Sequence, residues 1–520
     1  MAVARAYAIA LVGVQGHVVE IEADIENGLV ALLLVGLPDT ALREARDRIR
    51  SAIINSQQNW PLRRITVGLS PASLPKRGAG FDLGLAIAIL AAAGSVSKEQ
   101  LGDTVFLGEL GLDGRVRPVP GVLPSIAAAA AAGFSRAVVP VQNAAEAALV
   151  PSMQIVAVRT LSSLIEWLRD DGAGVPVSGV QVLESGSGIA PPTADVDPSA
   201  PRRDLADVVG QPVARRAAEI CAAGGHHMLL LGPPGTGKTM IAERLPTIMP
   251  PLDPPDALEV SAIHSVAGVL RPERPLVIEP PFCAPHHTAT KAAIVGGGSG
   301  IIKPGAASLA HHGCLFLDEA PEFDRDVLDA LRQPIESGEV VVARSGLTAR
   351  FPSRFTLVLA ANPCPCARTA ATGSGCTCTP LVRRRYLARL SGPLLDRVDV
   401  KVEVMPVGRA ELLSDRQLAE PSAVVAARVA EARKRAAHRL RGTGWRLNGE
   451  IPGSELRRRF RPAASALAPL ERAMDLGQLS ARGADRIIRM SWTLADLAGE
   501  PRPGVAEVGT ALGLWLGAGM

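Results

Sequence analysis

The stretch Leu229-Leu-Leu-Gly-Pro-Pro-Gly-Thr-Gly-Lys-Thr-Met240 decides the fold, because an apolar strand runs into a glycine-rich loop and then into a helix. The loop has the P-loop form Gly232-x-x-x-x-Gly237-Lys238-Thr239. In such a loop backbone N–H groups surround the β-phosphate, the lysine reaches the β/γ oxygens and the Thr hydroxyl ligates Mg²⁺. A plain Gly/Pro turn would leave Lys238 at a helix N-terminus, where the macrodipole disfavours a cation unless an anion binds. We therefore predict that a nucleoside triphosphate with Mg²⁺ binds to Gly232, Pro233, Pro234, Gly235, Thr236, Gly237, Lys238 and Thr239.

Two further strands end in polar residues that suit the same site. Gly313-Cys-Leu-Phe-Leu-Asp318-Glu319 is an apolar strand followed by two acids, the Walker B pattern. Asp318 is expected to hold Mg²⁺ through water, and Glu319 to deprotonate the attacking water. The strand 355–361 ends in Asn362, whose amide can bridge that water and the γ-phosphate. Without the P-loop, Asp318 and Glu319 would be interpreted as a solvated strand end and Asn362 as a turn residue. Because all three follow a P-loop in the sequence, we favour a role in the nucleotide site.

Composition indicates a globular chain of about three domains, with 520 residues of which 47% are hydrophobic and 20% charged. With an aromatic share of only 3%, we do not expect stacking on bases to be the main way in which the chain contacts nucleic acid, and the net charge of +4 does not by itself indicate a nucleic-acid partner. The longest apolar runs are well short of the ~20 residues that cross a bilayer. Residues 6–14 continue into an alternating strand without a convincing cleavage site, so we expect a cytoplasmic protein with no membrane contact.

The pattern along the chain predicts an α/β fold class in three parts. Residues 1–172 alternate strand-like and helical segments, which is typical of an α/β domain. Residues 173–203 are rich in Gly, Ser and Pro and are expected to form a flexible linker. A second α/β domain with the P-loop spans 204–404, and helical periodicity over 405–520 predicts an all-α lid.

A basic stretch lies in the predicted lid. Between residues 428 and 461 eleven Lys and Arg stand against three acids. One interpretation is a solvated helix face, and the other is a surface that follows the phosphates of DNA. The excess of positive charge favours the second interpretation. These cations are Arg428, Arg433, Lys434, Arg435, Arg439, Arg441, Arg446, Arg457, Arg458, Arg459 and Arg461.

Four of the seven cysteines are clustered, and the odd total argues against a secreted disulfide framework. Cys364, Cys366, Cys376 and Cys378 form a Cys-x-Cys…Cys-x-Cys pattern in a Gly-, Thr- and Ala-rich loop. Four thiolates suit tetrahedral Zn²⁺, which would stabilise a loop with little core of its own. The alternative is four reduced thiols. The histidine pairs at 226–227, 286–287 and 311–312 lack an evident second ligand, so we expect them to pack rather than to bind metal.

Taken together with the segment Ser391-Gly-Pro-Leu-Leu-Asp-Arg397-Val-Asp399, these motifs resemble the AAA+ ATPases of the magnesium-chelatase-like group, and within it the YifB/ComM family. The resemblance implies that Arg397 is an arginine finger reaching a neighbouring subunit's nucleotide, and that Arg482 in Ser480-Ala-Arg482 is a sensor-2 residue. It also implies a helix-2 insert over 263–310, a pre-sensor-1 hairpin over 338–351, and a homo-hexameric ring. For Arg397 the alternative is an internal ion pair with Asp399.

Residues 1–172 resemble the Lon-protease-like fold of the S5 type. Where Lon-type peptidases carry their serine, this chain has Gly78-Ala-Gly-Phe81, and where they carry their lysine it has Pro120-Gly-Val-Leu123. Because the nucleophile and the base are both missing at these positions, we expect no peptidase activity from this domain. We expect this domain to support the ring or to bind DNA.

The resemblance implies an ATP-hydrolysing ring motor that acts on single-stranded or branched DNA, by helicase action or branch migration in recombination or natural transformation. The alternative is a motor that remodels a partner protein, as the magnesium-chelatase ATPase subunit does. A third option is a nucleotide-switched scaffold with slow hydrolysis.

Overall fold

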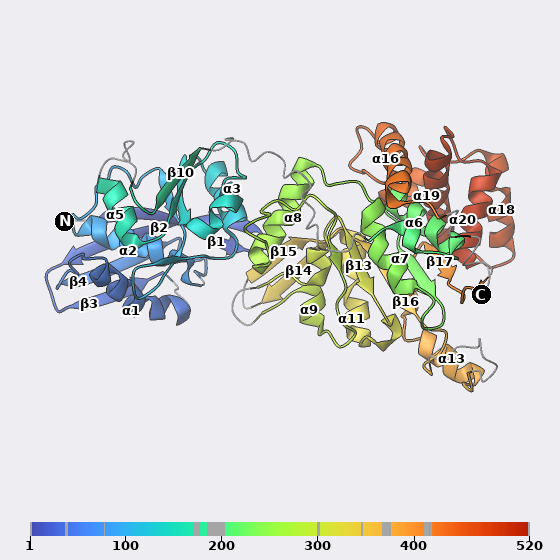
Figure 1. Cartoon of the computed structure of the whole chain (residues 1–520), viewed down its shortest axis with the longest axis horizontal. Helices are drawn as coiled ribbons and strands as arrows, with labels where there is room; N and C mark the ends of the chain where they lie inside the picture. The colour runs from blue at the N-terminus through green and yellow to red at the C-terminus, as the bar shows by residue number, and fades with distance from the viewer. Residues whose placement is uncertain are drawn as a thin grey trace.

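The computed structural model describes residues 3–36, 40–76, 78–169, 177–184, 203–298, 302–344, 347–366, 376–409, 415 and 419–517. Figure 1 shows three parts in a row along the long axis: an N-terminal α/β part, a central α/β part and a group of C-terminal helices. The fold class is α/β, as predicted.

The N-terminal part is a mixed sheet of eight strands in the order β10-β9-β8-β5-β1-β2-β4-β3. Its strands are β1 (Ala4–Val12), β2 (Gln15–Glu26), β3 (Ala31–Val35), β4 (Arg64–Ser70), β5 (Thr104–Phe106), β8 (Arg136–Pro140), β9 (Gln154–Val158) and β10 (Val180–Glu184). Its helices are α1 (Thr40–Asn55), α2 (Asp82–Ala92), α3 (Val122–Ala131), α4 (Ala144–Ala147) and α5 (Leu161–Arg169), and a small hairpin pairs β6 (Glu109–Leu110) with β7 (Val116–Arg117).

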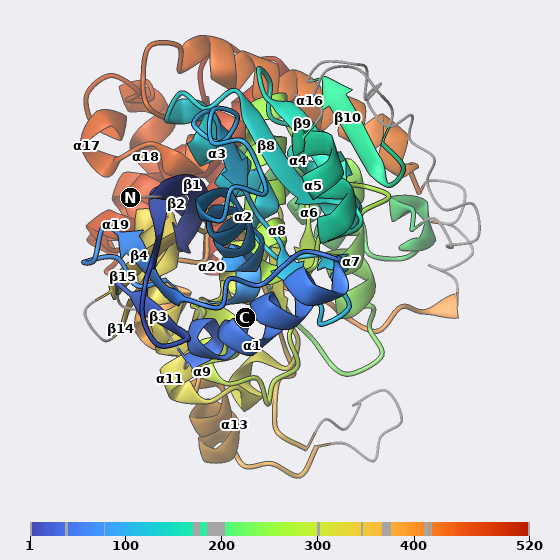
Figure 2. The same cartoon turned by 90° about the vertical axis from the view of Figure 1, so that its left-hand side faces the viewer.

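Helices cover both faces of this sheet because the strand side chains alternate. Ala6 and Ala8 of β1 share a core with α1, α2 and α5, whereas Ile9 shares a second core with α3 and α4. Figure 2 looks at this end of the molecule, with α2 beside β1 and β2. The result is a three-layer α/β/α arrangement.

One segment of the predicted linker belongs to this sheet. Residues 180–184 form β10, which pairs antiparallel with β9. The linker prediction is therefore wrong for β10, because Val180 and Leu183 pack against the two cores of the N-terminal part and extend the sheet edge despite the Gly/Pro-rich surroundings. Most of the remaining span from 173 to 203 lies outside the described residues.

The central part is built on a five-stranded parallel sheet in the order β12-β13-β16-β11-β17. The strands are β11 (Met228–Leu231), β12 (Phe282–Cys283), β13 (Cys314–Leu317), β16 (Thr356–Ala361) and β17 (Val400–Glu403). β11, β13 and β16 are buried throughout, which is why they read as continuous apolar runs. Because all five strands are parallel, the residues that follow β11, β13 and β16 meet at one edge of the sheet.

The helices of the central part are α6 (Pro212–Gly224), α7 (Lys238–Arg244), α8 (Pro254–Ala267), α9 (Lys291–Val295), α10 (Ala306–Leu309), α11 (Arg325–Ala330), α12 (Arg332–Ser337), α13 (Pro380–Leu387) and α14 (Gly392–Leu395). α6 and α7 pack on one face of the sheet, and α9, α10 and α11 on the other. The hairpin expected over 338–351 is present as β14 (Glu339–Arg344) paired antiparallel with β15 (Leu347–Pro352); Ser345 and Gly346 at its turn lie outside the described residues.

The described elements after residue 404 are all helical. They include α16 (Ser422–Arg439), α17 (Gly453–Leu456), α18 (Ala464–Asp475), α19 (Ala481–Ala498) and α20 (Val505–Leu516). These helices share one apolar core with α6 and with β11 and β17. No helix within the described ranges is long and apolar enough to cross a membrane.

The N-terminal part docks on the insert and on the hairpin of the central part. The end of β1 and the turn to β2 place Leu11, Val12 and Val14 against Ile302 and Phe351. Gly13 lies at the centre of this contact with φ +66°, and a Cβ there would come within 2.7 Å of the Arg350 carbonyl oxygen. The close approach of two backbones therefore requires glycine at this position.

Candidate active site

The P-loop runs from the end of β11 to the start of α7, as the sequence predicts. Gly235 and Gly237 have φ values of +79° and +91°, which glycine adopts without strain. Gly232 is needed for a different reason, because a Cβ there would overlap the carbonyl oxygen of Val404 after β17. The Thr236 hydroxyl donates to the Pro233 carbonyl oxygen at 2.9 Å and closes the loop on itself.

Lys238 lies buried in the loop and is held by oxygen acceptors. Its Nζ donates to the carbonyl oxygens of Gly232 at 2.7 Å and Pro233 at 2.8 Å, and to Oδ1 of Asn362 at 3.1 Å. Burial lowers the pKa of Lys238, while the carboxylates of Asp318 and Glu319 act to raise it. These acceptors are the ones that phosphate oxygens would replace, so the geometry fits a bound β/γ-phosphate.

The Walker B acids and Asn362 lie at the same edge of the sheet as the P-loop. Asp318 follows β13, and its Oδ2 accepts a hydrogen bond from the Thr239 hydroxyl at 2.9 Å. A hydroxyl and a carboxylate at this distance are an oxygen pair of the kind that Mg²⁺ takes, directly or through water. The structure thus brings together Lys238, Thr239, Asp318 and Asn362, which are distant in sequence.

Glu319 lies beside a histidine to which the sequence assigns only a packing role. Its backbone has φ +50°, and its Oε2 lies 3.3 Å from Nδ1 of His287. His287 follows β12 and Glu319 follows β13. Because β12 and β13 are parallel neighbours in the sheet, the two side chains lie close together. The sequence does not predict this contact, because β12 has only two residues and is too short to give a periodicity signal.

Arg397 and Asp399 precede β17 and therefore lie at the opposite edge of the sheet from the P-loop. The internal Arg397–Asp399 pair considered from sequence is not formed. Arg397 pairs with Glu336, and its guanidinium also donates to the Pro393 carbonyl oxygen. Asp399 instead accepts from Arg486 of α19 and lies 3.2 Å from Nδ1 of His226.

Arg482 and Arg397 line one cleft of about 1260 Å³ between the central part and the C-terminal helices. The cleft also contains Arg486 and Arg489 of α19, which places the first turns of that helix beside the edge that carries Arg397. The structure therefore brings the two predicted arginines together, and separates both from the P-loop of the same chain.

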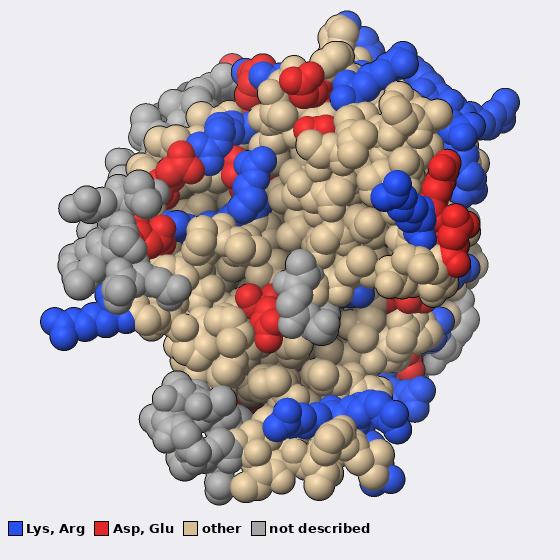
Figure 3. Space-filling model, turned by 90° about the vertical axis from the view of Figure 1, so that its right-hand side faces the viewer, with Lys and Arg blue, Asp and Glu red and all other residues tan. Residues whose placement is uncertain are grey.

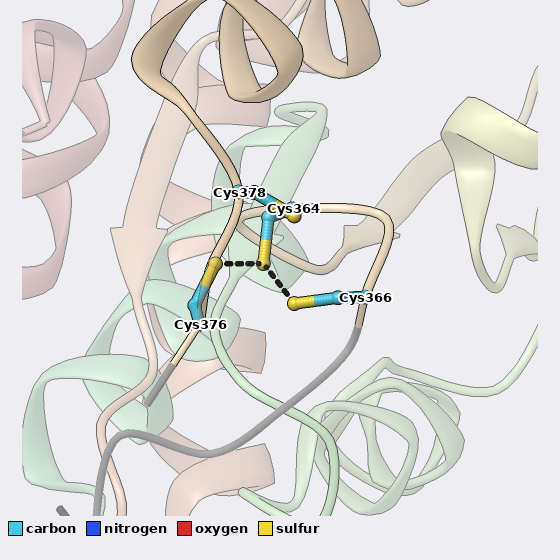
Figure 4. Close-up of side chains that lie close together, drawn as sticks. All are labelled: Cys364, Cys366, Cys376 and Cys378. Carbon is cyan, nitrogen blue, oxygen red and sulfur yellow. Dashed lines mark hydrogen bonds between the residues drawn. The ribbon is translucent and has the colours of Figure 1, made fainter. Parts of the chain in front are cut away.

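The four clustered cysteines face one another (Figure 4). Cys364 Sγ lies 3.2 Å from the sulfurs of Cys366 and Cys376, and the four Sγ atoms all lie within 4.8 Å of one another. Four sulfurs at about 2.3 Å from Zn²⁺ would be roughly 3.8 Å apart. The donor set therefore fits a tetrahedral ion, and it starts two residues after Asn362.

A second cluster, Glu259 with His311 and His312, fits a metal less well. His311 Nδ1 accepts the N–H of Arg354 at 2.8 Å, so the proton of the neutral ring is on Nε2, which faces Glu259 at 3.1 Å. The neutral imidazole then has no free lone pair for an ion. His311 and His312 lie next to carboxylates of α8, and the expectation that they are not ligands stays a prediction.

Most of the basic stretch is paired within the chain. Six of its eleven cations form ion pairs, and Arg433 donates to the Ala222 carbonyl oxygen. Several partners lie outside the stretch and were not counted from sequence, namely Glu219, Asp256, Glu420, Asp485 and Asp496. Figure 3 shows this end of the molecule, where basic side chains gather at the margin with acids among them and much of the face is uncharged. The charge excess of the stretch therefore overstates its free positive charge.

The chain matches known proteins over nearly its full length. Family models described as subunit ChlI of Mg-chelatase, magnesium chelatase subunit ChlI, and the ChlI C-terminal region match residues 21–143, 204–412 and 419–514. An uncharacterized protein of Mycobacterium tuberculosis is 51% identical over 514 residues, 98% of each chain. The competence protein ComM of Haemophilus influenzae is 40% identical over 519 residues, 99% of this chain and 97% of that protein. YifB of Escherichia coli is 40% identical over 489 residues, 94% of this chain and 92% of that protein. The chain therefore belongs to the YifB/ComM family of magnesium-chelatase-like AAA+ proteins.

Proposed function

We propose that the protein is an ATP-hydrolysing AAA+ ring motor that acts on DNA. The observation that carries the ATPase proposal is the meeting of Lys238, Thr239, Asp318 and Asn362 at one edge of the sheet. Lys238 and the loop N–H groups would hold the phosphates, and Thr239 and Asp318 would hold Mg²⁺, which supplies charge neutralisation at the β/γ oxygens.

Hydrolysis at this site forms a bond between the water oxygen and the γ-phosphorus while the bond from that phosphorus to the β-phosphate oxygen breaks. Glu319 takes the proton that the water loses, and ADP and phosphate leave. Asn362 orients the water and the γ-phosphate through its amide.

The site is proposed to be shared between subunits of a homo-hexamer that assembles with ATP. Arg397 and Arg482 line the same cleft at the far edge of the sheet from the chain's own P-loop. From there, they would meet the phosphates bound by a neighbour, with Arg397 as the finger and Arg482 as sensor 2. An arginine suits this task because its fork donates to two phosphate oxygens at once.

DNA is the proposed substrate of the motor. The family resemblance implies that the insert and the hairpin line the central pore of the ring, and cations on these two elements are the support from this structure. Lys291 and Lys303 of the insert and Arg344 of the hairpin are exposed; Arg350 of the hairpin is exposed too, but it pairs with Glu339 at 2.6 Å. Cations in a pore neutralise phosphates without reading sequence, which suits helicase action or branch migration. The Haemophilus influenzae relative ComM is named a competence protein, and we propose a comparable role in recombination or natural transformation. The alternative remains a motor that remodels a partner protein.

The Cys364, Cys366, Cys376 and Cys378 cluster is proposed to hold a structural Zn²⁺. The support is the convergence of four sulfurs in a loop that leaves β16 just beyond Asn362. The ion would stabilise this loop and contribute no step to hydrolysis. Metal analysis of protein purified without chelator should give about one zinc per chain, and Cys376→Ser should lose it; a metal-free wild type would contradict the proposal.

For the N-terminal part we propose a Lon-protease-like fold of the S5 type without peptidase chemistry, in a cytoplasmic protein. Gly78 and Ala79 occupy the start of a 3₁₀ turn before α2, and Gly121 with Val122 starts α3. Neither place offers a nucleophile or a base. The domain would support the ring.

The test of the proposed function is the ATPase rate of the full chain with and without single-stranded or branched DNA, at several salt concentrations. We expect stimulation by DNA that falls steeply with salt. Lys238→Ala should abolish nucleotide binding, while Glu319→Gln should bind ATP and not hydrolyse it. If no DNA changes the ATPase rate, the proposal that the motor acts on DNA is wrong, and the alternative of a motor that remodels a partner protein is left.

The shared site has its own test. Arg397→Ala and Lys238→Ala should each be inactive alone, and mixing them should restore part of the activity, because the second variant still supplies a finger to the first. Absence of rescue in rings shown to be mixed would contradict a finger in trans.

A further inference from the structure

Helix α13 projects from the central part and carries three consecutive arginines, Arg383, Arg384 and Arg385. Figures 1 and 2 both show this helix standing out from the body of the molecule, and in Figure 1 it lies well apart from the hairpin of β14 and β15. Tyr386 is buried and anchors one side of the helix, whereas Leu381 and the three arginines are exposed. The side of α13 that carries the arginines therefore faces solvent.

The chain on both sides of α13 is held close to the nucleotide site. The cysteine cluster lies just ahead of the helix, and Thr379 caps its first turn by accepting the N–H of Val382. After the helix, Arg389 Nη1 donates to Oε2 of Glu322 at 3.0 Å and to the Pro321 carbonyl oxygen at 3.2 Å. These contacts fix the base of the projection, so its arginines are presented from a defined position.

The three arginines differ in what they contact. Cys376 lies beside the Arg383 guanidinium and raises its pKa, so this cation is engaged by the cysteine cluster. Arg384 and Arg385 form no ion pair with any residue of the described part of the chain, and the sequence of α13 contains no acid. Figure 3 faces this end of the molecule and shows basic side chains on the projection at the bottom. Two cations of α13 are thus free to bind an external anion, unlike most of the basic stretch.

The chemistry of this surface favours the phosphates of a nucleic acid over a protein partner. A stable protein interface buries about 800 Å² on each partner around an apolar core. The apolar side chains that α13 exposes, Leu381 at 47% and Val382 at 38%, are too few for such a core. A guanidinium, by contrast, donates to two phosphate oxygens at once and needs no apolar contact.

We propose that α13 binds the phosphate backbone of DNA outside the pore, through Arg384 and Arg385. A single strand entering or leaving the ring would be held there by charge and not by its sequence. This inference rests on the proposed function, in which the motor acts on DNA, and it adds a second contact to those of the insert and the hairpin.

Binding of a fluorescently labelled oligo-dT strand to the full chain, measured by anisotropy at several salt concentrations, tests the inference. The double variant Arg384→Gln with Arg385→Gln removes two phosphate contacts. The slope of log Kd against log salt concentration should therefore fall by about 1.4, and Kd should rise about tenfold at about 0.15 M salt. A labelled strand of mixed sequence should lose the same affinity, because the contacts are to phosphates and not to bases.

Arg325→Gln with Arg332→Gln is the matched control. It removes the same charge from solvent-accessible arginines of α11 and α12 that already lie close to Asp329. The control should keep the Kd and the salt slope of wild type. Equal losses in the control and in the α13 variant would mean that net charge alone sets the affinity, and would overturn the inference. Wild-type affinity in an α13 variant with an unchanged melting temperature would overturn it too, and would leave an acidic protein segment as the partner of α13.

The outcome for α13 is separable from the outcome for the proposed function. If DNA stimulates the ATPase of wild type but the α13 variant binds the strand as tightly as wild type, the proposed function stands and the inference is wrong. If wild type binds the strand through α13 but its ATPase rate does not change with DNA, the inference stands and the proposal of a DNA motor is wrong.

Discussion

Replacing Asp399 by asparagine tests the contact between the central sheet and the C-terminal helices. Asp399 precedes β17, and its carboxylate, 5% exposed, accepts from Arg486 of α19 and pairs with His226. Burial would raise the pKa of Asp399, but the Arg486 guanidinium and the His226 ring outweigh it and hold that pKa well below its usual range. The carboxylate is therefore charged in the folded chain, and its partners depend on that charge.

The magnitude follows from what the substitution leaves behind. Asparagine keeps the shape and removes the charge, so Arg486, 17% exposed, loses its counter-charge. Removing one partner of a buried pair costs about 3–5 kcal/mol, and the partial hydration of Arg486 favours the lower end. At about 2–4 °C per kcal/mol, the melting temperature should fall by roughly 6–12 °C.

Thermal unfolding of the full chain by circular dichroism, with urea unfolding in parallel, measures this effect. Arg486→Met is the second arm, and the two substitutions together should fall short of the sum of their single effects by at least about 1 kcal/mol. The folded-state pKa is depressed, so the stabilisation is present above about pH 4 and is lost as pH falls below it. Asp399→Asn should therefore lose less stability than wild type on acidification. A change within about 0.5 kcal/mol at pH 7, or strictly additive effects, would refute the reasoning.

Two further predictions concern glycines. Gly232→Ala should abolish nucleotide binding and destabilise the central sheet, because the added Cβ would overlap the Val404 carbonyl oxygen. Gly235 has open space around it, so Gly235→Ala should cost only about 1–2 kcal/mol of backbone strain. Equal effects of the two variants in nucleotide-binding and melting assays would contradict this prediction. Gly13→Ala should loosen the contact between the N-terminal part and the hairpin, which proteolysis or hydrogen exchange at β15 would detect as a faster rate. Gly94→Ala is the control, because Gly94 has a similar φ and no neighbour within 4 Å. That variant should leave the exchange rate at β15 unchanged. Unchanged protection of β15 in Gly13→Ala would argue against the docking contact.

The nucleotide site could be predicted from sequence because its signals are local. The strand–loop–helix pattern around Lys238 and the strands that end in Asp318 and Asn362 each carry their own motif. A parallel sheet then brings strand ends together whatever lies between them. The hairpin 339–352 was predictable for the same reason, since its alternation and turn lie within one short segment.

The remaining parts depend on partners that are distant in sequence. Glu336 next to Arg397 and His287 next to Glu319 arise from which elements are neighbours in space, and no spacing rule connects them. The ion pairs of the basic stretch could not be predicted for the same reason, because Arg446 pairs with Asp256 and Arg457 with Asp485, which lie outside the stretch. Local charge counting cannot see these pairs.

The separation of Arg397 from the P-loop leads to a prediction about concentration. β11 and β17 are parallel neighbours, so Arg397 before β17 and Lys238 after β11 are separated by at least the length of a strand. Four residues at about 3.3 Å each give roughly 13 Å, which is more than an arginine side chain spans. A single chain therefore cannot bring its own Arg397 to its own nucleotide. If the finger is needed, the ATPase rate per chain should fall as the protein is diluted below the concentration at which rings form, and light scattering should show the same midpoint. The Arg397→Ala variant should show no such fall, because its low rate does not depend on a neighbour. A wild-type rate per chain that stays constant down to the monomer would show that hydrolysis needs no second subunit.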